Sequence, residues 1–304
     1  MHQDTDQASE LRNATGEQTA AERLPAGLRC IGIGSGKGGV GKTMISVGLA
    51  CCLARRDYRV LLVDADLGLA NVDLQMGVDP VYTLQDVVYG DCSLAQAVVH
   101  ARRGLDLILS SSGAKEMVEL GNARRELLVG DLVRFAGQYD YLLIDVGAGI
   151  GGTVTGFLAA APEVLTVVAN EPTSVMDAYS LVKVLLAEKT PPSIMLVLNM
   201  VRSLDEGERL GQRINAITRK FLGTEFPVAG IVPYHATVTD AIRRRSPVVD
   251  HAPDSAPARC LEELAGFVAA GGGRSRRPGL RASFFDRLLG VDASLRRAGK
   301  EPAA

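Results

Sequence analysis

Short apolar runs alternate with longer amphipathic segments from residue 28 onward. The runs are four to six residues long and almost wholly apolar: Leu28–Ile33, Val60–Val63, Leu105–Leu109, Tyr141–Ile144, Val164–Ala169, Ile194–Leu198 and Val228–Val232. Runs without polar alternation are typical of strands that are buried on both faces. Helical candidates lie between them, over residues 43–54, 174–188 and 206–222. The alternation predicts an α/β fold, a single doubly wound, mostly parallel sheet with helices on both faces.

The two ends of the chain lack this alternation. Residues 1–27 are polar and without sustained periodicity, which predicts an arm outside the core. Glycine, arginine and proline dominate residues 271–279, a composition typical of a linker. We therefore expect three parts: an N-terminal arm over 1–27, one domain over 28–270, and a C-terminal segment over 271–304.

Composition and charge exclude several classes of protein. With 47% hydrophobic and 22% charged residues among 304, global disorder is excluded. The net charge of -2 argues against a surface that grips nucleic acid throughout, although residues 271–304 carry +5 and the remainder -7. The five cysteines form no CxxC pair, as a metal-cluster carrier would need. No signal peptide and no apolar stretch of about 18 residues is present, so a cytoplasmic protein is expected.

A phosphate-binding motif follows the first apolar run. Residues 36–43 read Gly-Lys-Gly-Gly-Val-Gly-Lys-Thr and match the P-loop pattern G-x-x-x-x-G-K-[ST] in full. Glycines let consecutive amide groups point at a polyphosphate, and the following helix offers its positive end. Lys42 is then expected to reach the β- and γ-phosphates, and the Thr43 hydroxyl to ligate Mg²⁺. The motif predicts a P-loop nucleoside triphosphatase.

Carboxylates stand at two further strand ends. Asp145 ends a buried run and can hold Mg²⁺ through water, while Gly149 can place an amide near the γ-phosphate. Asp64 and Asp66 follow the run that begins at Val60, and either is free to orient the attacking water. An aspartate at a strand end is otherwise often a turn or helix cap.

Lys37, inside the motif, gives the loop its resemblance to a known family. Lys-Gly-Gly-Val-Gly-Lys-Thr resembles the deviant Walker A motif of the MinD/ParA class of ATPases. That resemblance implies an ATP-dependent homodimer in which Lys37 reaches the partner protomer's nucleotide. Val63–Gly68 resembles the first switch of the class, with Asp66 activating water, and Asp145–Gly149 resembles the second, although Val146 departs from the usual small or hydroxylated residue.

The resemblance extends these assignments to a full site. It implies that Asn199 reads the adenine and that the segment from Val232 faces the purine. The expected catalytic residues are Lys37, Lys42, Asp66 and Asp145, with Mg²⁺ held by Thr43, Asp66 and Asp145. The expected nucleotide contacts are Gly36, Lys37, Gly38, Gly39, Val40, Gly41, Lys42, Thr43, Met44, Gly149, Glu171, Asn199, Pro233 and Tyr234.

Within that class the chain is most similar to the flagellar-number regulators (the FlhG or FleN family). The segments that carry this similarity are Glu171–Ser174, Leu198–Ser203 and Val232–Tyr234. The arm contains Asp-Gln-Ala-Ser-Glu-Leu-Arg, similar to the family's DQAxxLR element, which implies activation of the GTPase FlhF. The residues expected to contact that partner are Asp6, Gln7, Ala8, Leu11 and Arg12. The composition of the arm, taken alone, is typical of a disordered polar segment.

The C-terminal segment contains a short amphipathic pattern. Phe284, Phe285, Leu288 and Leu289 fall on one face of a helix and are flanked by arginines. The pattern resembles the membrane-targeting helix of MinD-like proteins and predicts reversible binding to an anionic inner membrane. One copy binds weakly, whereas two copies on a dimer gain avidity. A helix that packs back on its own domain is the open alternative.

The resemblance thus implies a slowly hydrolysing ATPase that regulates flagellar number or placement. Further partners expected on the resemblance are a flagellar transcription regulator or switch protein. The alternative functions are division-site placement, chromosome partition, and regulation of a transcription factor without important turnover.

Overall fold

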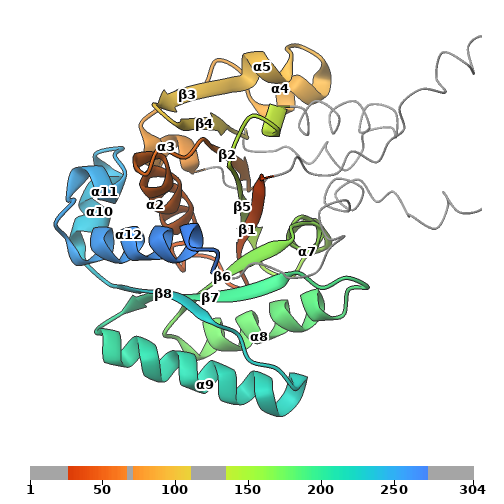
Figure 1. The fold of residues 1–304 in the computed structure, drawn as a ribbon, viewed down its shortest axis with the longest axis vertical. Coiled ribbons are helices and arrows are strands. Elements are labelled where there is room, and N and C mark those ends of the chain that lie inside the picture. The colour runs from red at the N-terminus through yellow and green to blue at the C-terminus, as the bar shows by residue number, and fades with distance from the viewer. Residues whose placement is uncertain (1–26, 67–70, 111–134, 273–304) are drawn as a thin grey trace, which may run out of the picture.

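The computed structural model describes residues 27–66, 71–110 and 135–272. Their strands form one eight-stranded sheet in the order β3-β4-β2-β5-β1-β6-β7-β8. In chain order the strands are β1 (Arg29–Ser35), β2 (Val60–Ala65), β3 (Val98–Arg102), β4 (Leu105–Ile108), β5 (Tyr141–Ala148), β6 (Glu163–Ala169), β7 (Ser193–Val201) and β8 (Val228–Pro233). All neighbours pair in parallel except β3 and β4, which are antiparallel. The predicted doubly wound, mostly parallel sheet is confirmed (Figure 1).

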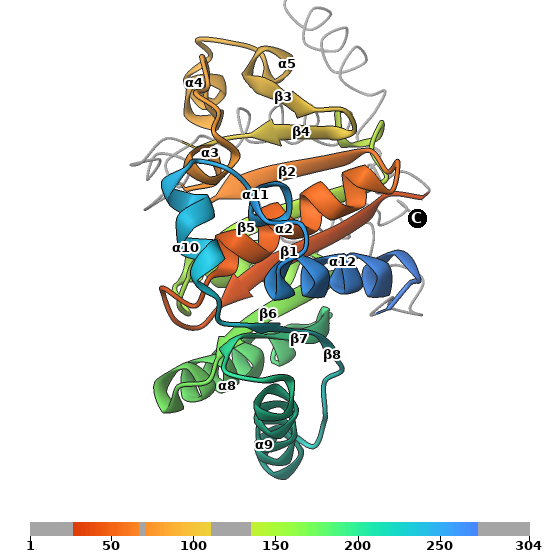
Figure 2. The ribbon, with the colours of Figure 1, turned by 90° about the vertical axis from the view of Figure 1, so that its left-hand side faces the viewer.

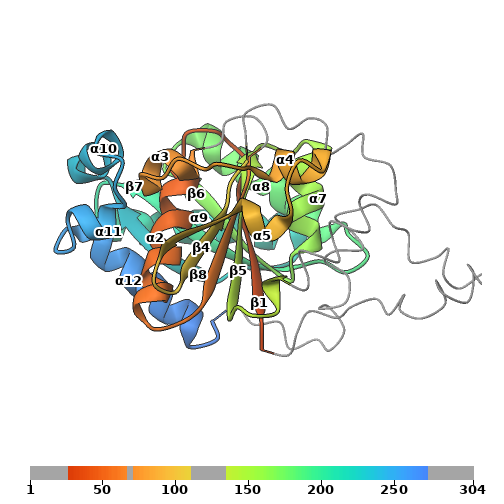
Figure 3. The same cartoon turned by 90° about the horizontal axis from the view of Figure 1, so that it is seen from above.

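Helices cover both faces of this sheet. One face carries α2 (Lys42–Arg55), α3 (Val72–Met76), α10 (Ala236–Arg243), α11 (Val248–His251) and α12 (Ala256–Ala269). The other carries α4 (Leu84–Tyr89), α5 (Leu94–Ala97), α7 (Gly152–Ala160), α8 (Pro172–Leu186) and α9 (Leu204–Leu222). Figure 3 shows α2 and α10 to α12 on one side of the strands and α7 on the other.

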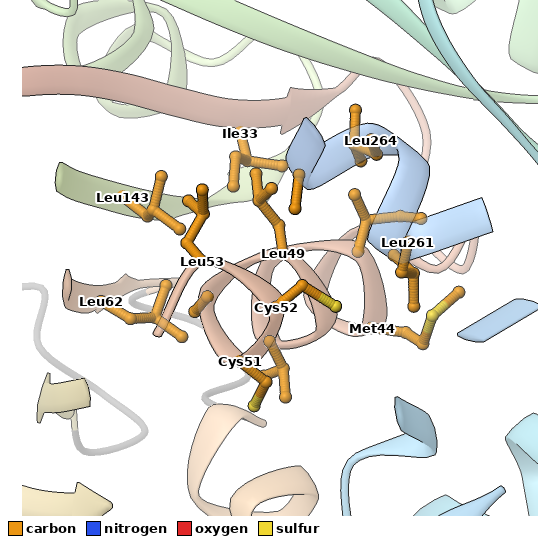
Figure 4. Packing of buried hydrophobic residues seen from close by; sticks show 14 of the residues in the cluster. Ile33, Met44, Leu49, Cys51, Cys52, Leu53, Leu62, Leu143, Leu261 and Leu264 are labelled. Carbon is orange, nitrogen blue, oxygen red and sulfur yellow. The ribbon is translucent and has the colours of Figure 1, made fainter. Parts of the chain in front are cut away.

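Helix α2 is the central packing element of its face. It lies across the sheet beside α12, as Figure 2 shows, and nearly every residue of its length is buried. Leu49 and Leu53 pack between Ile33 and Leu62 of the sheet and Leu261 of α12 (Figure 4). An apolar helix of this kind is stabilised by burial on all sides rather than by an amphipathic face. The start of α2, and the loop before it, is thereby held in a fixed position.

The predicted site residues meet at one edge of the sheet. In the parallel register Asp64 of β2 lies beside Asp145 of β5, and Ile33 of β1 lies beside the same aspartate. On the other side Asn199 of β7 lies beside Val232 of β8. Because parallel strands end at a common edge, side chains that are far apart in the sequence converge there.

The five cysteines are all free thiols. Cys30, Cys51 and Cys52 are buried, and a free cysteine in such a position packs as a small apolar residue. Burial is the largest cause that raises the pKa of the Cys51 thiol to about 12, so this thiol stays protonated near neutral pH. No described helix is long and apolar enough to cross a bilayer.

Candidate functional site

The phosphate loop connects the end of β1 to the first residue of α2, Lys42. Gly39 and Gly41 have φ of +78° and +82°, in the left-handed region that favours glycine. A side chain at Gly36 would lie 2.3 Å from the Asp177 backbone, and one at Gly41 would lie 2.3 Å from Asn199 Nδ2. At Gly38 and Gly39 nothing lies within 4 Å of such an added carbon. Gly36 and Gly41 are therefore needed for packing, while the middle of the loop is open to a ligand.

Lys42 and Asp145 form the buried centre of the site. The Lys42 Nζ lies 2.9 Å from Asp145 Oδ1, and both side chains are less than a tenth exposed. Ser46, one helical turn after Lys42, donates its hydroxyl to the same oxygen at 2.9 Å. The other oxygen, Oδ2, is buried without a hydrogen-bond partner. A buried carboxylate oxygen without a donor suits a metal-bound water, so the residues present fit a Mg²⁺–nucleotide.

The structure separates the roles of the two aspartates after β2. Asp64 is buried, and its carboxylate accepts the amide protons of Asp66, Asn71 and Val72 at 3.0 to 3.2 Å. Burial, with the nearby Asp145 charge, raises the pKa of Asp64 to about 7. Asp66 instead lies with its Oδ2 3.8 Å from Lys42 Nζ and is partly exposed. Asp66 therefore faces the phosphate loop, whereas Asp64 holds the loop that follows it.

Lys37 is directed along the surface of its own protomer. Its ammonium forms an ion pair with Glu171 and donates to Thr173 Oγ1 at 3.1 Å. Both members of the ion pair are exposed to solvent. Glu171, predicted as a nucleotide contact, is thus the partner of Lys37 in the single chain. Reach across a dimer interface remains a prediction for Lys37.

Three further predicted contacts differ in what they offer a nucleotide. Thr43 is half-buried in the first turn of α2, one residue after Lys42. The Met44 side chain lies in the hydrophobic core, as Figure 4 shows. Met44 can therefore contact a nucleotide only through its backbone. The Gly149 amide donates to the Ser35 carbonyl oxygen at 2.9 Å. An approach of that amide to a γ-phosphate therefore requires this bond to break.

The remaining predicted contacts lie on the opposite side of the loop. Asn199 is buried and donates from Nδ2 to the Val40 carbonyl oxygen at 2.7 Å. This hydrogen bond links the end of β7 to the phosphate loop. Pro233 ends β8, and Tyr234 follows it with an exposed ring. The Tyr234 amide donates to the Val201 carbonyl oxygen at 2.8 Å and holds the end of β8 beside the end of β7.

Sequence analysis missed two supporting hydroxyls, Ser46 and Thr173. Ser46 could have been found from its spacing, because residues four apart share a helix face and Lys42 precedes it by four. Thr173 had no such signal, since its contact with Lys37 spans 136 positions of the chain. The arm residues from Asp6 to Arg12 and the tail residues from Phe284 to Leu289 lie outside the described residues.

Comparison with known proteins places this geometry in a family. The family model described as "CobQ/CobB/MinD/ParA nucleotide binding domain" matches residues 31–248, which include the phosphate loop and every strand except the first residues of β1. The chain belongs to this family. As a member of the MinD/ParA family it is an ATPase.

Curated relatives and solved structures agree with this membership. The chain is 37% identical over 238 residues to the antiactivator FleN of Pseudomonas aeruginosa, covering 78% of this chain and 85% of that protein. It is 31% identical to the flagellum site-determining protein YlxH of Helicobacter pylori, covering 85% of this chain and 89% of the relative. The septum site-determining protein MinD complexed with Mg-ADP from Pyrococcus horikoshii superposes with a TM-score of 0.67 at 25% identity, covering 82% of this chain and 99% of that one.

Proposed function

We propose that the chain is an ATP-dependent dimerising switch that regulates the number or placement of flagella. The observation that carries the proposal is Lys37: a second lysine stands in a complete phosphate loop, at the surface, where its ammonium contacts the exposed Glu171 carboxylate and the Thr173 hydroxyl. Such a lysine is available to a second protomer at little energetic cost. The flagellum site-determining protein YlxH, and the similarity to the antiactivator FleN, support the choice of process.

The roles of the site residues follow from their positions. Lys42 would offset charge at the β- and γ-phosphates, and Asp145, which contacts Lys42 in this structure, would hold a metal-bound water. Thr43 offers a hydroxyl ligand at the start of α2. Asp66 is placed to orient the attacking water, because its carboxylate faces Lys42 at the phosphate loop, whereas the Asp64 carboxylate accepts the amides of Asn71 and Val72. Bound Mg²⁺ supplies electrophilic stabilisation of the transferring phosphoryl group.

Partner binding and membrane binding extend the proposal to the two ends of the chain. The arm, through Asp6, Gln7, Ala8, Leu11 and Arg12, would activate a GTPase of the FlhF type. The tail, through Phe284, Phe285, Leu288 and Leu289, would bind anionic lipid reversibly and cycle the protein between cytoplasm and inner membrane. A flagellar transcription regulator or switch protein would bind the dimer.

Dimerisation is tested by light scattering of full-length protein with ATP or ADP. We expect ATP to produce dimers, and Lys37→Ala to remain monomeric while it still binds ATP. Lys42→Ala should lose ATP binding itself. Wild-type protein that stays monomeric with ATP, or Lys37→Ala that dimerises as well as wild type, would refute the switch.

Membrane binding is tested by co-sedimentation with anionic vesicles, for full-length protein and for a chain that ends at Gly273. We expect ATP to increase binding of the full-length chain about 10²- to 10⁴-fold, because two tails act together. Truncation should abolish binding. Binding that ignores ATP, or that survives truncation, contradicts the tail hypothesis.

A further inference from the structure

Ser46 is a polar side chain in the apolar interior of α2. Every residue of this helix from Met44 to Ala54 is buried, and Ser46 alone among them carries a hydroxyl or a charge. A buried hydroxyl is unfavourable unless it is hydrogen-bonded. Apolar packing and helix propensity would both favour alanine at this position. The presence of a serine is therefore explained by what its hydroxyl contacts.

Two acceptors lie within hydrogen-bond distance of the Ser46 hydroxyl. The Lys42 carbonyl oxygen, four residues earlier in the helix, lies 3.1 Å from Ser46 Oγ, and Asp145 Oδ1 of β5 lies 2.9 Å from it. A serine in a helix can always bond the carbonyl four residues before it, so that contact needs no carboxylate. A hydroxyl has one proton to donate, and a charged acceptor binds it more strongly than a carbonyl. Ser46 thus joins α2 to the Asp145 carboxylate.

The two oxygens of Asp145 have different surroundings. Oδ1 accepts from Lys42 Nζ and from Ser46, each at 2.9 Å, whereas Oδ2 is buried without a hydrogen-bond partner. If the Lys42 ammonium turns to a phosphate, as its proposed role requires, Ser46 is the donor that remains on Oδ1 among the described residues. The Asp145 side chain is 1% exposed, so bulk water offers no substitute donor. A carboxylate that is held at Oδ1 keeps Oδ2 available to a ligand.

We propose that Ser46 is a positioning residue for Asp145: its hydroxyl holds Oδ1, so that Oδ2 stays available to a water bound to Mg²⁺. This assignment rests on the proposed binding of a Mg²⁺–nucleotide at the phosphate loop. Since Ser46 is fully buried, it acts through Asp145 and does not itself contact the nucleotide. Removal of a donor that orients the surroundings of a metal commonly lowers metal affinity about 10- to 100-fold.

Two substitutions separate the hydroxyl from the volume that it fills. Ser46→Ala removes the donor, and Ser46→Cys fills the space with a thiol, which is a weak donor. Ser180→Ala is the matched control, because Ser180 of α8 donates to the carbonyl oxygen of Met176, also four residues earlier, at 2.9 Å. The probe is ADP, measured by calorimetry on the full-length chain with Mg²⁺ or with EDTA. The ratio of the two affinities reports the metal separately from the nucleotide, and ADP keeps the proposed ATP-dependent dimer out of the measurement.

We expect the gain in ADP affinity that Mg²⁺ provides to be about tenfold smaller in Ser46→Ala and in Ser46→Cys than in the wild type. Their affinity for ADP in EDTA should stay within about twofold of wild type, and Ser180→Ala should match the wild type in both conditions. An unchanged gain in Ser46→Ala, an equal loss with Mg²⁺ and with EDTA, or a wild-type gain in Ser46→Cys overturns the assignment. Wild-type protein that binds no ADP, or Lys42→Ala that binds it normally, would instead contradict the phosphate site itself.

Discussion

At the residue scale, Lys37 is the side chain with a partner that changes during the proposed cycle. In the single chain its ammonium pairs with Glu171, and dimerisation would break that pair. The pair is exposed, so it contributes at most about 1 kcal/mol. We expect Glu171→Gln to lower the protein concentration at which half of the chains are dimeric with ATP, by about two- to fivefold. Sedimentation velocity measures this shift.

The exposed Glu188, just beyond α8, provides the control for that measurement. Glu188→Gln removes the same charge without touching Lys37 and should leave the midpoint unchanged. Weaker dimerisation in Glu171→Gln would contradict the release of Lys37. It would mean that Glu171 contacts the nucleotide or the second protomer directly.

The two aspartates after β2 give a second prediction at this scale. Asp66→Asn should lower the rate of ATP hydrolysis about 10²- to 10⁴-fold, because the Asp66 carboxylate lies beside Lys42 at the phosphate loop. Asp64→Ala should lower the free energy of unfolding by about 1–3 kcal/mol, since it leaves amide groups of Asp66, Asn71 and Val72 without their acceptor. Single-turnover hydrolysis and thermal denaturation report the two effects. Asp64→Ala with normal stability would disprove this division.

At the element scale, the sequence predicted those strands that are buried on both faces. β1 and β6 are apolar almost throughout, and burial of that kind leaves a clear pattern. β3 was missed because Val98–Arg102 is only half-buried, carries His100 and Arg102, and pairs antiparallel at the sheet edge. A polar edge strand has no distinctive periodicity.

The same contrast holds for the site. The phosphate loop could be predicted because its residues are contiguous, and their spacing is set by the backbone that surrounds a phosphate. The different roles of Asp64 and Asp66 could not be predicted from the sequence. They depend on which carboxylate accepts hydrogen bonds from the amides of Asn71 and Val72. Met200 of β7, at a φ of +57°, lies in a β-bulge, and this bulge likewise depends on the pairing of β7 with β8, which is distant in the chain.

Asp250 links three elements and gives a pH-dependent prediction. Arg55 of α2 and Arg102 of β3 lie 2.7 and 2.5 Å from its carboxylate on α11. Burial acts to raise the pKa of Asp250, but hydrogen bonds and charge from Arg102, and then from Arg55, outweigh it and lower the pKa. A lowered carboxylate pKa stabilises the fold above the unfolded value of about 4, and the stabilisation is lost as pH falls through the native pKa.

We therefore expect Asp250→Asn to destabilise the chain by about 1–2 kcal/mol at pH 7 and by progressively less below about pH 4. Urea denaturation across that range measures the difference. Asp57→Asn is the matched control, because Asp57 pairs with Arg103 in a fully exposed position and should change stability by less than about 0.5 kcal/mol throughout. A destabilisation by Asp250→Asn that does not shrink with acid would exclude the ion pair as its cause.

At the scale of the whole molecule, the site and the ends of the described chain lie at opposite ends of β1. The phosphate loop follows Ser35, the last residue of β1, whereas Arg29, its first, forms a buried ion pair with Glu163. Arg29 also donates to the carbonyl oxygens of Val268, near the end of α12, and Gly272. The segment that leads to the tail thus starts beside the segment that leads to the arm. A dimer built across the phosphate loops would leave residues 27 and 272 of each protomer away from the interface.

The proposed cycle makes stability depend on protein concentration, but only with ATP. A ligand that binds only the native state stabilises it by about 2.7 kcal/mol at a hundred times its dissociation constant, and a second protomer adds a term that grows with its own concentration. In an Asp66→Asn background, where ATP persists, we expect the melting temperature to rise with protein concentration. Lys37→Ala in that background should be stabilised by ATP to the same extent at every concentration, because it binds nucleotide without pairing. Differential scanning fluorimetry over a hundredfold range of protein concentration measures both slopes. A slope that is equal in the two variants would show that the added stability comes from the nucleotide alone and that Lys37 takes no part in holding the protomers together.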